Sequence, residues 1–326
     1  MGFWINSKIQ IGKYKFAGVH EVKISKSIHS FVDTCTLQVP TDYRLKQVGI
    51  PQTEGAALKA NMLFKEGDKV IIQLGWNGRY NDEFVGYVRR VNFNTPVEIE
   101  CEGYVYLLRQ PLPYKSFVNT NLKTLLQYII QGTDIVLSPA TPDVPVEKFD
   151  INNVTGAEVL EQLKKKLLVT IFFSGNELFA GLEYTAYKGN VILKLGWNVV
   201  RDNQLKQRIA DDGAIEIMLT GVKNDGTKIT VTAGKSTNIL KVKTHIVTDQ
   251  KTLQAMADKM LKDKQYSGYE GKITCLGFPY YQHAWTVDLR DDRYPERAGH
   301  YVLDSVEVRY GTGGYWRIGG ISIKVA

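Results

Sequence analysis

The residue types that most often do chemistry are few in this sequence and widely spaced. Three cysteines, Cys35, Cys101 and Cys275, are odd in number and far apart, which fits neither a disulfide framework nor a C-x-x-C metal site. No two of the five histidines have the spacing that places a pair of zinc ligands on one helix face. We therefore expect buried free thiols, no metal ion and no cofactor.

Two pairs of adjacent aspartates are the best candidates for acid–base catalysis. Asp211–Asp212 and Asp291–Asp292, the second with Glu296 nearby, are the kind of carboxylates that a cell-wall hydrolase uses. Neighbouring side chains diverge, however, and both pairs lie in polar stretches, so a solvated loop is the favoured interpretation. The glycines of 311–314 fit a hairpin turn, and no strand is followed by the glycine motif of a nucleophile elbow, phosphate loop or dinucleotide site. We expect no catalytic residue and no enzyme.

The net charge of +7 is spread along the chain. Lysine and arginine exceed aspartate and glutamate by three in residues 1–112, by none in 113–203 and by four in 204–326. The sequence lacks the dense basic clusters of a phosphate-tracking groove, so we expect no sequence-specific binding of nucleic acid. It also lacks a run of 18 apolar residues and a secretory signal, so we expect no membrane span and a chain that starts in the cytoplasm.

Alternating apolar residues predict strands through most of residues 1–112. Asn77–Gly78 fits a tight hairpin turn between two of them. About six short strands of this kind indicate an antiparallel barrel, closed or nearly closed, or a sandwich. Residues 43–64 lack a pattern, and a connection of this length is a candidate arm for contacting a partner.

The strand predicted for residues 97–108 has the clearest alternation, with apolar side chains on one face and charged or aromatic side chains on the other. We expect the second face to be solvated or to lie in an interface, where tyrosine is enriched. This face consists of Glu98, Glu100, Glu102, Tyr104 and Tyr106.

The middle of the chain predicts a small α+β domain. Apolar residues at helical spacing indicate a helix from about residue 119 to a stop at Gly132. Thr155 with Glu158 is the capping-box signature of a second helix. A strand–turn–strand pair centred on residues 174–176 follows.

Residues 204–326 return to strands, and one helix at about 249–265 interrupts them. Lys241 and Lys243 share one face of a predicted strand. Their charge is opposite to that of the glutamates on the 97–108 strand.

The predicted fold class is therefore mainly β with an α+β insert. Two antiparallel β-barrel domains, 1–112 and 204–326, flank the α+β domain 113–203, and the last barrel carries the packed helix. Long sheets need closure or a partner for their edges, so we expect assembly. The candidate subunit-interface residues are Glu100, Glu102, Tyr104 and Tyr106 on one surface and Lys241 and Lys243 on another, whose opposite charges would pair barrel to barrel. A solvated sheet face is an equally good interpretation of each.

Several segments, in order along the chain, resemble baseplate hub proteins of contractile phage tails, the late-control-protein or Mu-type hub family. The likeness runs nearly end to end and extends to the N-terminal hub portion of type VI secretion spike proteins. No single motif is specific, so the order of the segments carries the resemblance. The matching segments are residues 66–91, 121–135, 153–166, 172–181, 253–279 and 299–325.

The resemblance implies a homotrimer in which two tube-like barrels per chain form a pseudo-sixfold ring. Such a ring adapts a sixfold tail tube to a threefold central spike, and its partners are the tail tube protein, the spike protein and other baseplate proteins. Residues 1–112 and 204–326 would form the wall, with 113–203 outside. The implied location is the virion tail baseplate, assembled in the bacterial cytoplasm. A related contractile injection or type VI secretion system, a cell-wall-degrading tail enzyme and a monomeric binding module remain alternatives.

Overall fold

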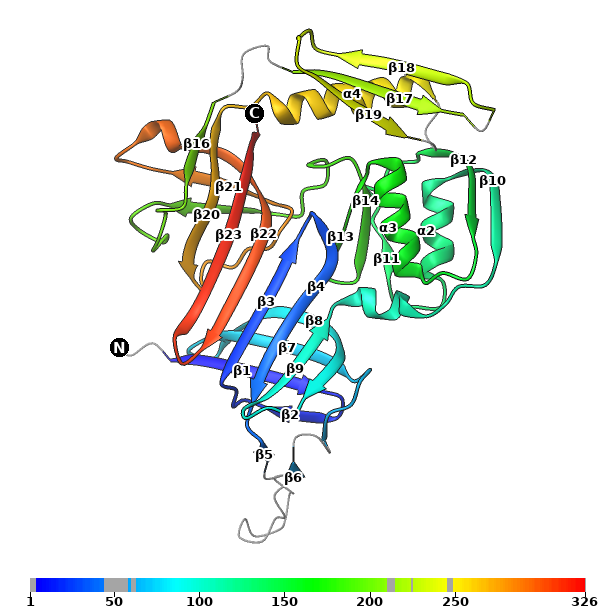
Figure 1. The fold of residues 1–326 in the computed structure, drawn as a ribbon. Helices are drawn as coiled ribbons and strands as arrows, with labels where there is room; N and C mark the ends of the chain where they lie inside the picture. Colours follow the sequence, from blue (N-terminus) through cyan, green and yellow to red (C-terminus); the bar gives the residue numbers. More distant parts are fainter. Residues whose placement is uncertain are drawn as a thin grey trace, which may run out of the picture.

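The computed structural model describes residues 4–43, 58–59, 63–209, 215–223, 225–244 and 249–325 (Figure 1). The first strands are β1 (Ile5–Ile11), β2 (Tyr14–Phe16), β3 (Glu21–Ser27), β4 (Ser30–Val39), β5 (Asp42–Tyr43), β6 (Leu58–Lys59), β7 (Lys69–Trp76), β8 (Arg79–Asn92) and β9 (Val97–Glu102). The middle holds the 3-10 helix η1 (Tyr104–Arg109), β10 (Lys115–Asn121), α2 (Leu122–Ile130), β11 (Val136–Leu137), β12 (Pro145–Ile151), α3 (Gly156–Leu167), β13 (Thr170–Ser174) and β14 (Glu177–Gly181). The rest comprises β15 (Asn190–Lys194), β16 (Lys206–Arg208), β17 (Glu216–Val222), β18 (Lys228–Ala233), β19 (Ile239–Thr244), α4 (Gln250–Lys264), β20 (Gly268–Leu276), β21 (Trp285–Arg290), η2 (Pro295–Arg297), β22 (Gly299–Gly311) and β23 (Gly314–Val325).

Strand β22 joins the two ends of the chain in one sheet. Its residues 299–303 pair with β21 and its residues 305–311 pair with β3, while β23 pairs along its other edge. The main path of the sheet is β16-β20-β23-β22-β3-β4-β9-β8-β7-β1-β2. Figure 1 shows β23, β22, β3 and β4 side by side, with β1 and β7 crossing β3 and β4.

The expected pair of antiparallel barrels is not confirmed. Among the described strands, the path ends at β16 and β2 and does not close. The reason lies in the length of β22, which has 13 residues against the 6 of β21. Because buried backbone groups must be paired, the second half of β22 takes up β3. The chain is mainly β, and the strands of its first and last parts are continuous.

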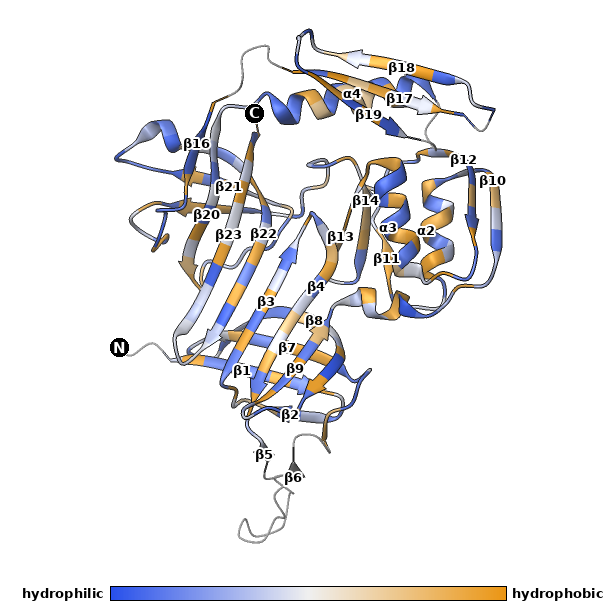
Figure 2. Cartoon of the chain, in the orientation of Figure 1, coloured by the Kyte–Doolittle hydropathy of each residue, from blue (hydrophilic) through white to orange (hydrophobic). Residues whose placement is uncertain are grey.

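The inward side chains of this sheet form one large hydrophobic core. Figure 2 colours hydrophobic residues orange, and orange alternates with blue along strands such as β3 and β22. Ile24 of β3 and Ile72 of β7 are at most 1% exposed, so the crossing layers meet on their apolar faces. The three cysteines lie in the same core and are free, which confirms the prediction of buried thiols. The hairpin at Asn77–Gly78 is also confirmed, with positive φ at both residues.

A fully buried ion pair lies in this core. Arg317 of β23 donates to the carboxylate of Glu83 on β8, and both residues are 0% exposed. The Tyr315 hydroxyl donates to Glu83 Oε1 at 2.5 Å, and Arg317 Nη1 donates to the carbonyl oxygen of Tyr281 at 2.7 Å. The first and last parts of the chain are therefore connected by charge as well as by strand pairing.

The middle layer, which comprises the elements from β10 to β14, has the helices and turns that the sequence predicts. Before α2, Asn121 Oδ1 accepts a hydrogen bond from the backbone N–H of Thr124 at 2.8 Å. Before α3, Thr155 Oγ1 accepts from the Glu158 N–H, and the Glu158 carboxylate accepts from the Thr155 N–H at 2.7 Å, which is the expected capping box. The hairpin of β13 and β14 turns at residues 174–176.

Strands β17, β18 and β19 form a separate three-stranded sheet, and the predicted helix α4 covers it. The inward side chains of this sheet and of α4 share a hydrophobic cluster with α2 and α3. The strands of residues 204–326 thus belong to two different sheets. The domain boundaries at 112 and 204 stay predictions, and the unpatterned connection 43–64 lies largely outside the described residues.

Polar and apolar contacts around the β3–β4 turn connect the main sheet to the middle layer, which holds α2, α3 and β10 to β14. His29, in the β3–β4 turn, lies between two carboxylates: its Nδ1 is 2.9 Å from Glu183 and its Nε2 is 3.4 Å from Asp304. Lys164 of α3 donates to the carbonyl oxygen of His29. Buried His283 donates from Nε2 to the carbonyl oxygen of Phe173 at 2.7 Å. A small apolar cluster completes these contacts: Ile28, Phe172, Phe179, Ala186 and Ala284.

The protonation of His29 gives a first prediction. Hydrogen bonds to Asp304 and Glu183 raise the pKa of His29 from 6.5 to about 9, against a smaller opposing effect of burial. Its stabilisation is therefore complete below pH 6.5 and is lost as the pH rises through 9. Because the side chain is half exposed, we expect less than about 1 kcal/mol from it. An NMR titration should give a midpoint near 9, falling toward 6.5 in Glu183→Gln/Asp304→Asn. The substitution of exposed Asp150→Asn is the control and should leave the midpoint unchanged. A His29 midpoint near 6.5 in the unmodified protein would contradict the contacts with Glu183 and Asp304.

Candidate functional site

The solvent-facing side of the main sheet is a candidate surface. One row of cross-strand neighbours runs over it, from Leu276 through Trp316, Arg309, Lys23, Thr36 and Glu100 to Arg90. This row joins β20, β23, β22, β3, β4, β9 and β8. We call it, with the outward residues beside it on the same strands, the outer face.

The charges of the outer face are balanced. Arg309 Nε donates to Glu307 at 2.6 Å, and Asn92 Nδ2 donates to Glu98 at 3.1 Å and to Glu100 at 2.7 Å. A face with equal numbers of cations and anions presents no net field for a polyanion. The outward cations are Lys23, Arg89, Arg90, Lys272 and Arg309, and the outward anions are Glu21, Glu98, Glu100, Glu102 and Glu307.

The four predicted interface residues near β9 do not share one face, so the expected strand through residue 108 is wrong. Strand β9 ends at Glu102, and Tyr104 and Tyr106 lie on η1. Glu100 and Glu102 lie on the outer side of β9, opposite Thr36 and Thr34, but Glu102 is covered. The tyrosines leave this face because the chain enters η1 after Gly103, where the Tyr106 N–H donates to the carbonyl oxygen of Gly103 at 3.1 Å. An interface role for these residues stays a prediction.

Glu102 and the two tyrosines serve local packing. Glu102 is 1% exposed and accepts hydrogen bonds from Arg89 at 2.5 Å and from Arg109 at 2.6 and 2.7 Å. Tyr106 stacks on Tyr87 with ring centroids 5.4 Å apart, and Tyr104 is 9% exposed. Both arginines come from outside the predicted strand, so the alternation of the strand gave no sign of them.

The two predicted lysines lie on β19, in the three-stranded sheet and not in the main sheet. Lys241 is directly opposite Met218, and Lys243 is opposite Thr220. Within the chain they are on a different sheet from Glu100, so the opposite charges do not meet. Their pairing between subunits remains a prediction.

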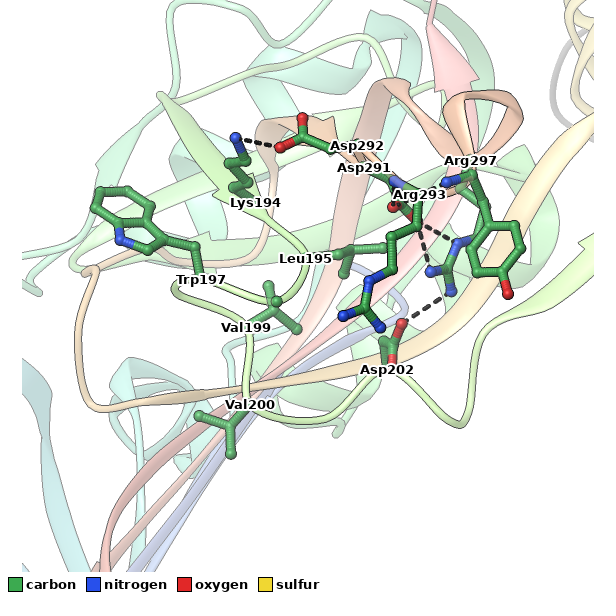
Figure 3. Close-up of a pocket in the computed structure, with 12 residues that line it drawn as sticks. Lys194, Leu195, Trp197, Val199, Val200, Asp202, Asp291, Asp292, Arg293 and Arg297 are labelled. Carbon is green, nitrogen blue, oxygen red and sulfur yellow. Dashed lines mark hydrogen bonds and ion pairs between the residues drawn. The ribbon is translucent and has the colours of Figure 1, made fainter.

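The aspartate pair Asp291–Asp292 lines a cleft of about 880 Å³, drawn in Figure 3. Asp291 is almost fully buried and accepts hydrogen bonds from the backbone N–H groups of Arg293 and Tyr294 and from Arg297. Burial alone raises the pKa of Asp291, but these donors outweigh it and hold the pKa below its usual value. Arg297 also pairs with Asp202 at 2.8 Å.

This arrangement fits an ion-pair network and not a pair of catalytic carboxylates. A general acid needs a raised pKa, whereas that of Asp291 is lowered. Asp292 has a 74% exposed side chain and pairs with Lys194 at 2.6 Å. The other pair, Asp211–Asp212, lies outside the described residues.

Among the described residues, no group of three histidine, cysteine or carboxylate side chains is arranged to hold a metal ion. No helix in the same residues has the length and apolar character needed to cross a membrane.

Sequence reasoning missed most of the outer face. Lys23, Thr36, Glu307 and Arg309 occupy the polar positions of alternating strands, and that alternation is visible in the sequence. The missing information was which strands are neighbours, because β3 and β22 are separated by most of the chain.

The chain matches no protein-family model and no curated protein sequence. Among solved structures it is similar to the 43 kDa tail protein of prophage MuSo2 from Shewanella oneidensis, with a TM-score of 0.65, 15% identity and 98% of each chain covered. It is similar to a tail protein from Neisseria meningitidis MC58, with a TM-score of 0.65, 12% identity, 98% of this chain and 96% of that chain covered. The chain has the fold of phage tail proteins.

The same fold occurs in the Escherichia coli c3393 protein, a component of the type VI secretion system with structural similarity to the bacteriophage T4 tail proteins gp27 and gp5. The TM-score is 0.60 at 10% identity, with 98% of this chain and 77% of that chain covered. These neighbours are tail-type structural proteins, which agrees with the expected hub resemblance.

Proposed function

We propose that the chain is the structural baseplate hub of a contractile phage tail. The observation that carries this proposal is the likeness of fold to two phage tail proteins over 98% of the chain. In this role three copies close into a pseudo-sixfold ring that adapts the sixfold tail tube to the threefold central spike. The hub works by presenting surfaces and has no catalytic residue.

The strand pairing supports a ring wall built from both ends of the chain. Within one chain, β22 and β3 already join the first and last strand-rich parts edge to edge. Repeating this alternation around three copies gives six strand-rich parts in a closed ring, which leaves no open edge. The α+β layer, residues 113–203, lies outside the wall in this arrangement and contacts other baseplate proteins.

We assign the outer face of the main sheet to the channel side of the wall. Five cations and five anions on this face allow a polyanion or an unfolded protein to pass without being held. A channel of this kind requires no sequence-specific contact with nucleic acid.

The oligomeric mass tests the proposal. With its tube and spike partners present, light scattering at micromolar concentration should give a complex that contains three copies of this 36.8 kDa chain. A matched control is the same sample with the partners omitted, which separates intrinsic from assisted assembly. A chain that stays monomeric in both samples would refute the ring.

A hub of a type VI secretion system is the second candidate, and the likeness to the secretion-system component favours it specifically. The two functions differ in the tube protein that the chain binds, so pull-down with each purified tube protein distinguishes them. A cell-wall-degrading enzyme remains as an alternative with a simple test. Peptidoglycan turnover that disappears in Asp291→Ala or Asp292→Ala would establish it, and absence of turnover would retire it.

A further inference from the structure

The three-stranded sheet of β17, β18 and β19 has one covered and one open face. Helix α4 packs against the inward side chains, among which Leu219 and Val231 are at most 4% exposed. The open face carries hydroxyl groups and lysines and no acidic side chain except Glu216 at its end. We call this open face the lysine face; it consists of Met218, Thr220, Val222, Lys228, Thr230, Thr232, Ile239, Lys241 and Lys243.

The lysines of this face have no acidic partner among the described residues. None of Lys228, Lys241 and Lys243 forms an ion pair or a side-chain hydrogen bond there. Glu216, the nearest acid in the register, accepts from the Ser236 N–H at 3.5 Å. The face therefore carries uncompensated positive charge, in contrast to the balanced outer face.

Strand β19 also has an open edge. Of the described strands it pairs only with β17, in parallel. Its side chains Ile239 and Leu240 are 40% and 41% exposed. A strand edge with free backbone donors and acceptors is a template for one more strand.

Lysines on an edge strand commonly prevent self-association. This role accounts for the exclusion of a second copy, because two lysine faces repel each other. It does not exclude an acidic strand, for which the same lysines are attractive. The positive charge of the lysines and the unpaired edge of β19 together favour an acidic segment in an extended conformation.

We propose that the lysine face binds an acidic protein segment that adds to β19 as an extended strand. The backbone of the segment pairs with the free edge of β19, and its carboxylates lie beside Lys241 and Lys243. This partner would take the place of the barrel-to-barrel pairing predicted for Lys241 and Lys243, and its binding does not depend on the hub function proposed above.

A nucleic acid is a less suitable occupant of this face. Phosphate-tracking surfaces that hold single strands combine cations with aromatic rings on which bases stack. The lysine face has neither an aromatic ring nor an arginine. A nucleic acid also makes no use of a strand edge, whereas an extended peptide does.

The experiment uses the full chain and a fluorescein-labelled peptide of alternating glutamate and valine. Anisotropy should show binding at low salt that weakens at about 0.5 M salt. Hydrogen exchange should show new protection of the β19 amides when the peptide is bound. In Lys241→Glu/Lys243→Glu the affinity should fall by at least about tenfold.

The matched control is Lys262→Glu, an exposed lysine on α4 outside the face, which should leave the affinity unchanged. Circular dichroism checks that each variant is folded. Three results would overturn the proposal: no binding at low salt, equal binding by the double variant, or preferred binding of a single-stranded DNA oligonucleotide. A peptide of alternating lysine and valine that binds equally well would also overturn it, since the edge alone would then be sufficient.

Discussion

The substitution Arg317→Met should destabilise the protein by roughly 3–5 kcal/mol, because it leaves the charge of Glu83 buried without its partner. Both residues are 0% exposed, and Glu83 keeps only the Tyr315 hydroxyl as a donor after the change. A carboxylate in this position cannot recover its lost hydration. The ion pair connects β8 to β23, so the loss should be felt in the cooperative unfolding of the main sheet.

The measurement is chemical denaturation at pH 7 with the matched double variant Glu83→Gln/Arg317→Met. The double variant removes both charges and keeps an acceptor for Tyr315, so it should be more stable than Arg317→Met alone. A control pair is available on the surface: Arg309→Met breaks an exposed contact with Glu307 and should cost less than about 1 kcal/mol. If Arg317→Met and Arg309→Met lower the free energy of unfolding equally, the buried pair contributes no more to stability than the exposed pair.

The substitution Asp33→Asn should make the protein more stable at alkaline pH, with the gain growing as the pH rises. Asp33 lies on β4, is 6% exposed, and its Oδ1 has no hydrogen-bond partner among the described residues. Burial raises the pKa of Asp33 from 3.8 to about 7, with Lys26 opposing part of this effect. The folded state therefore favours the protonated carboxyl, and stability is lost as the pH rises from about 4 through 7.

At 1.36 kcal/mol per pKa unit, this shift makes the unmodified protein about 3 kcal/mol less stable at pH 8 than at pH 5, relative to Asp33→Asn. Denaturation of both proteins at several pH values measures the difference and cancels the other titrating groups, His29 among them. The exposed Asp292→Asn is the control, and its difference from the unmodified protein should not follow this pH course. If the Asp33→Asn difference is flat between pH 5 and pH 8, the carboxyl is not held protonated by the fold.

Local signals in the sequence were sufficient for the helices and the tight turns. The cap of α3 needs only Thr155 and Glu158, and the hairpin after β7 needs only Asn77–Gly78, so neighbouring residues specify both. Helix α4 was placed to within a residue or two for the same reason. These elements do not depend on what the rest of the chain does.

Long-range packing decided the parts that the sequence did not predict. The alternation of residues 97–108 continues past Glu102, yet the chain enters η1 after Gly103, where Tyr106 bonds to the carbonyl oxygen of Gly103 and stacks on Tyr87. The partner of β22 was equally hidden, since the edges of two strands carry no sequence label for each other. Lys241 and Lys243 were found as one face of a strand, but their place in a separate sheet depends on α4 and the middle layer.

The pairing of β3 with β22 has a consequence for how the protein is made. During synthesis β3 emerges early, whereas the residues that occupy its edge come near the end of the chain. Contacts of such long sequence separation form late and leave the early strand exposed to wrong partners. A truncated chain thus displays an open β3 edge and lacks the Arg317 that neutralises Glu83. The main sheet can therefore form only in a chain that extends through β22 and β23.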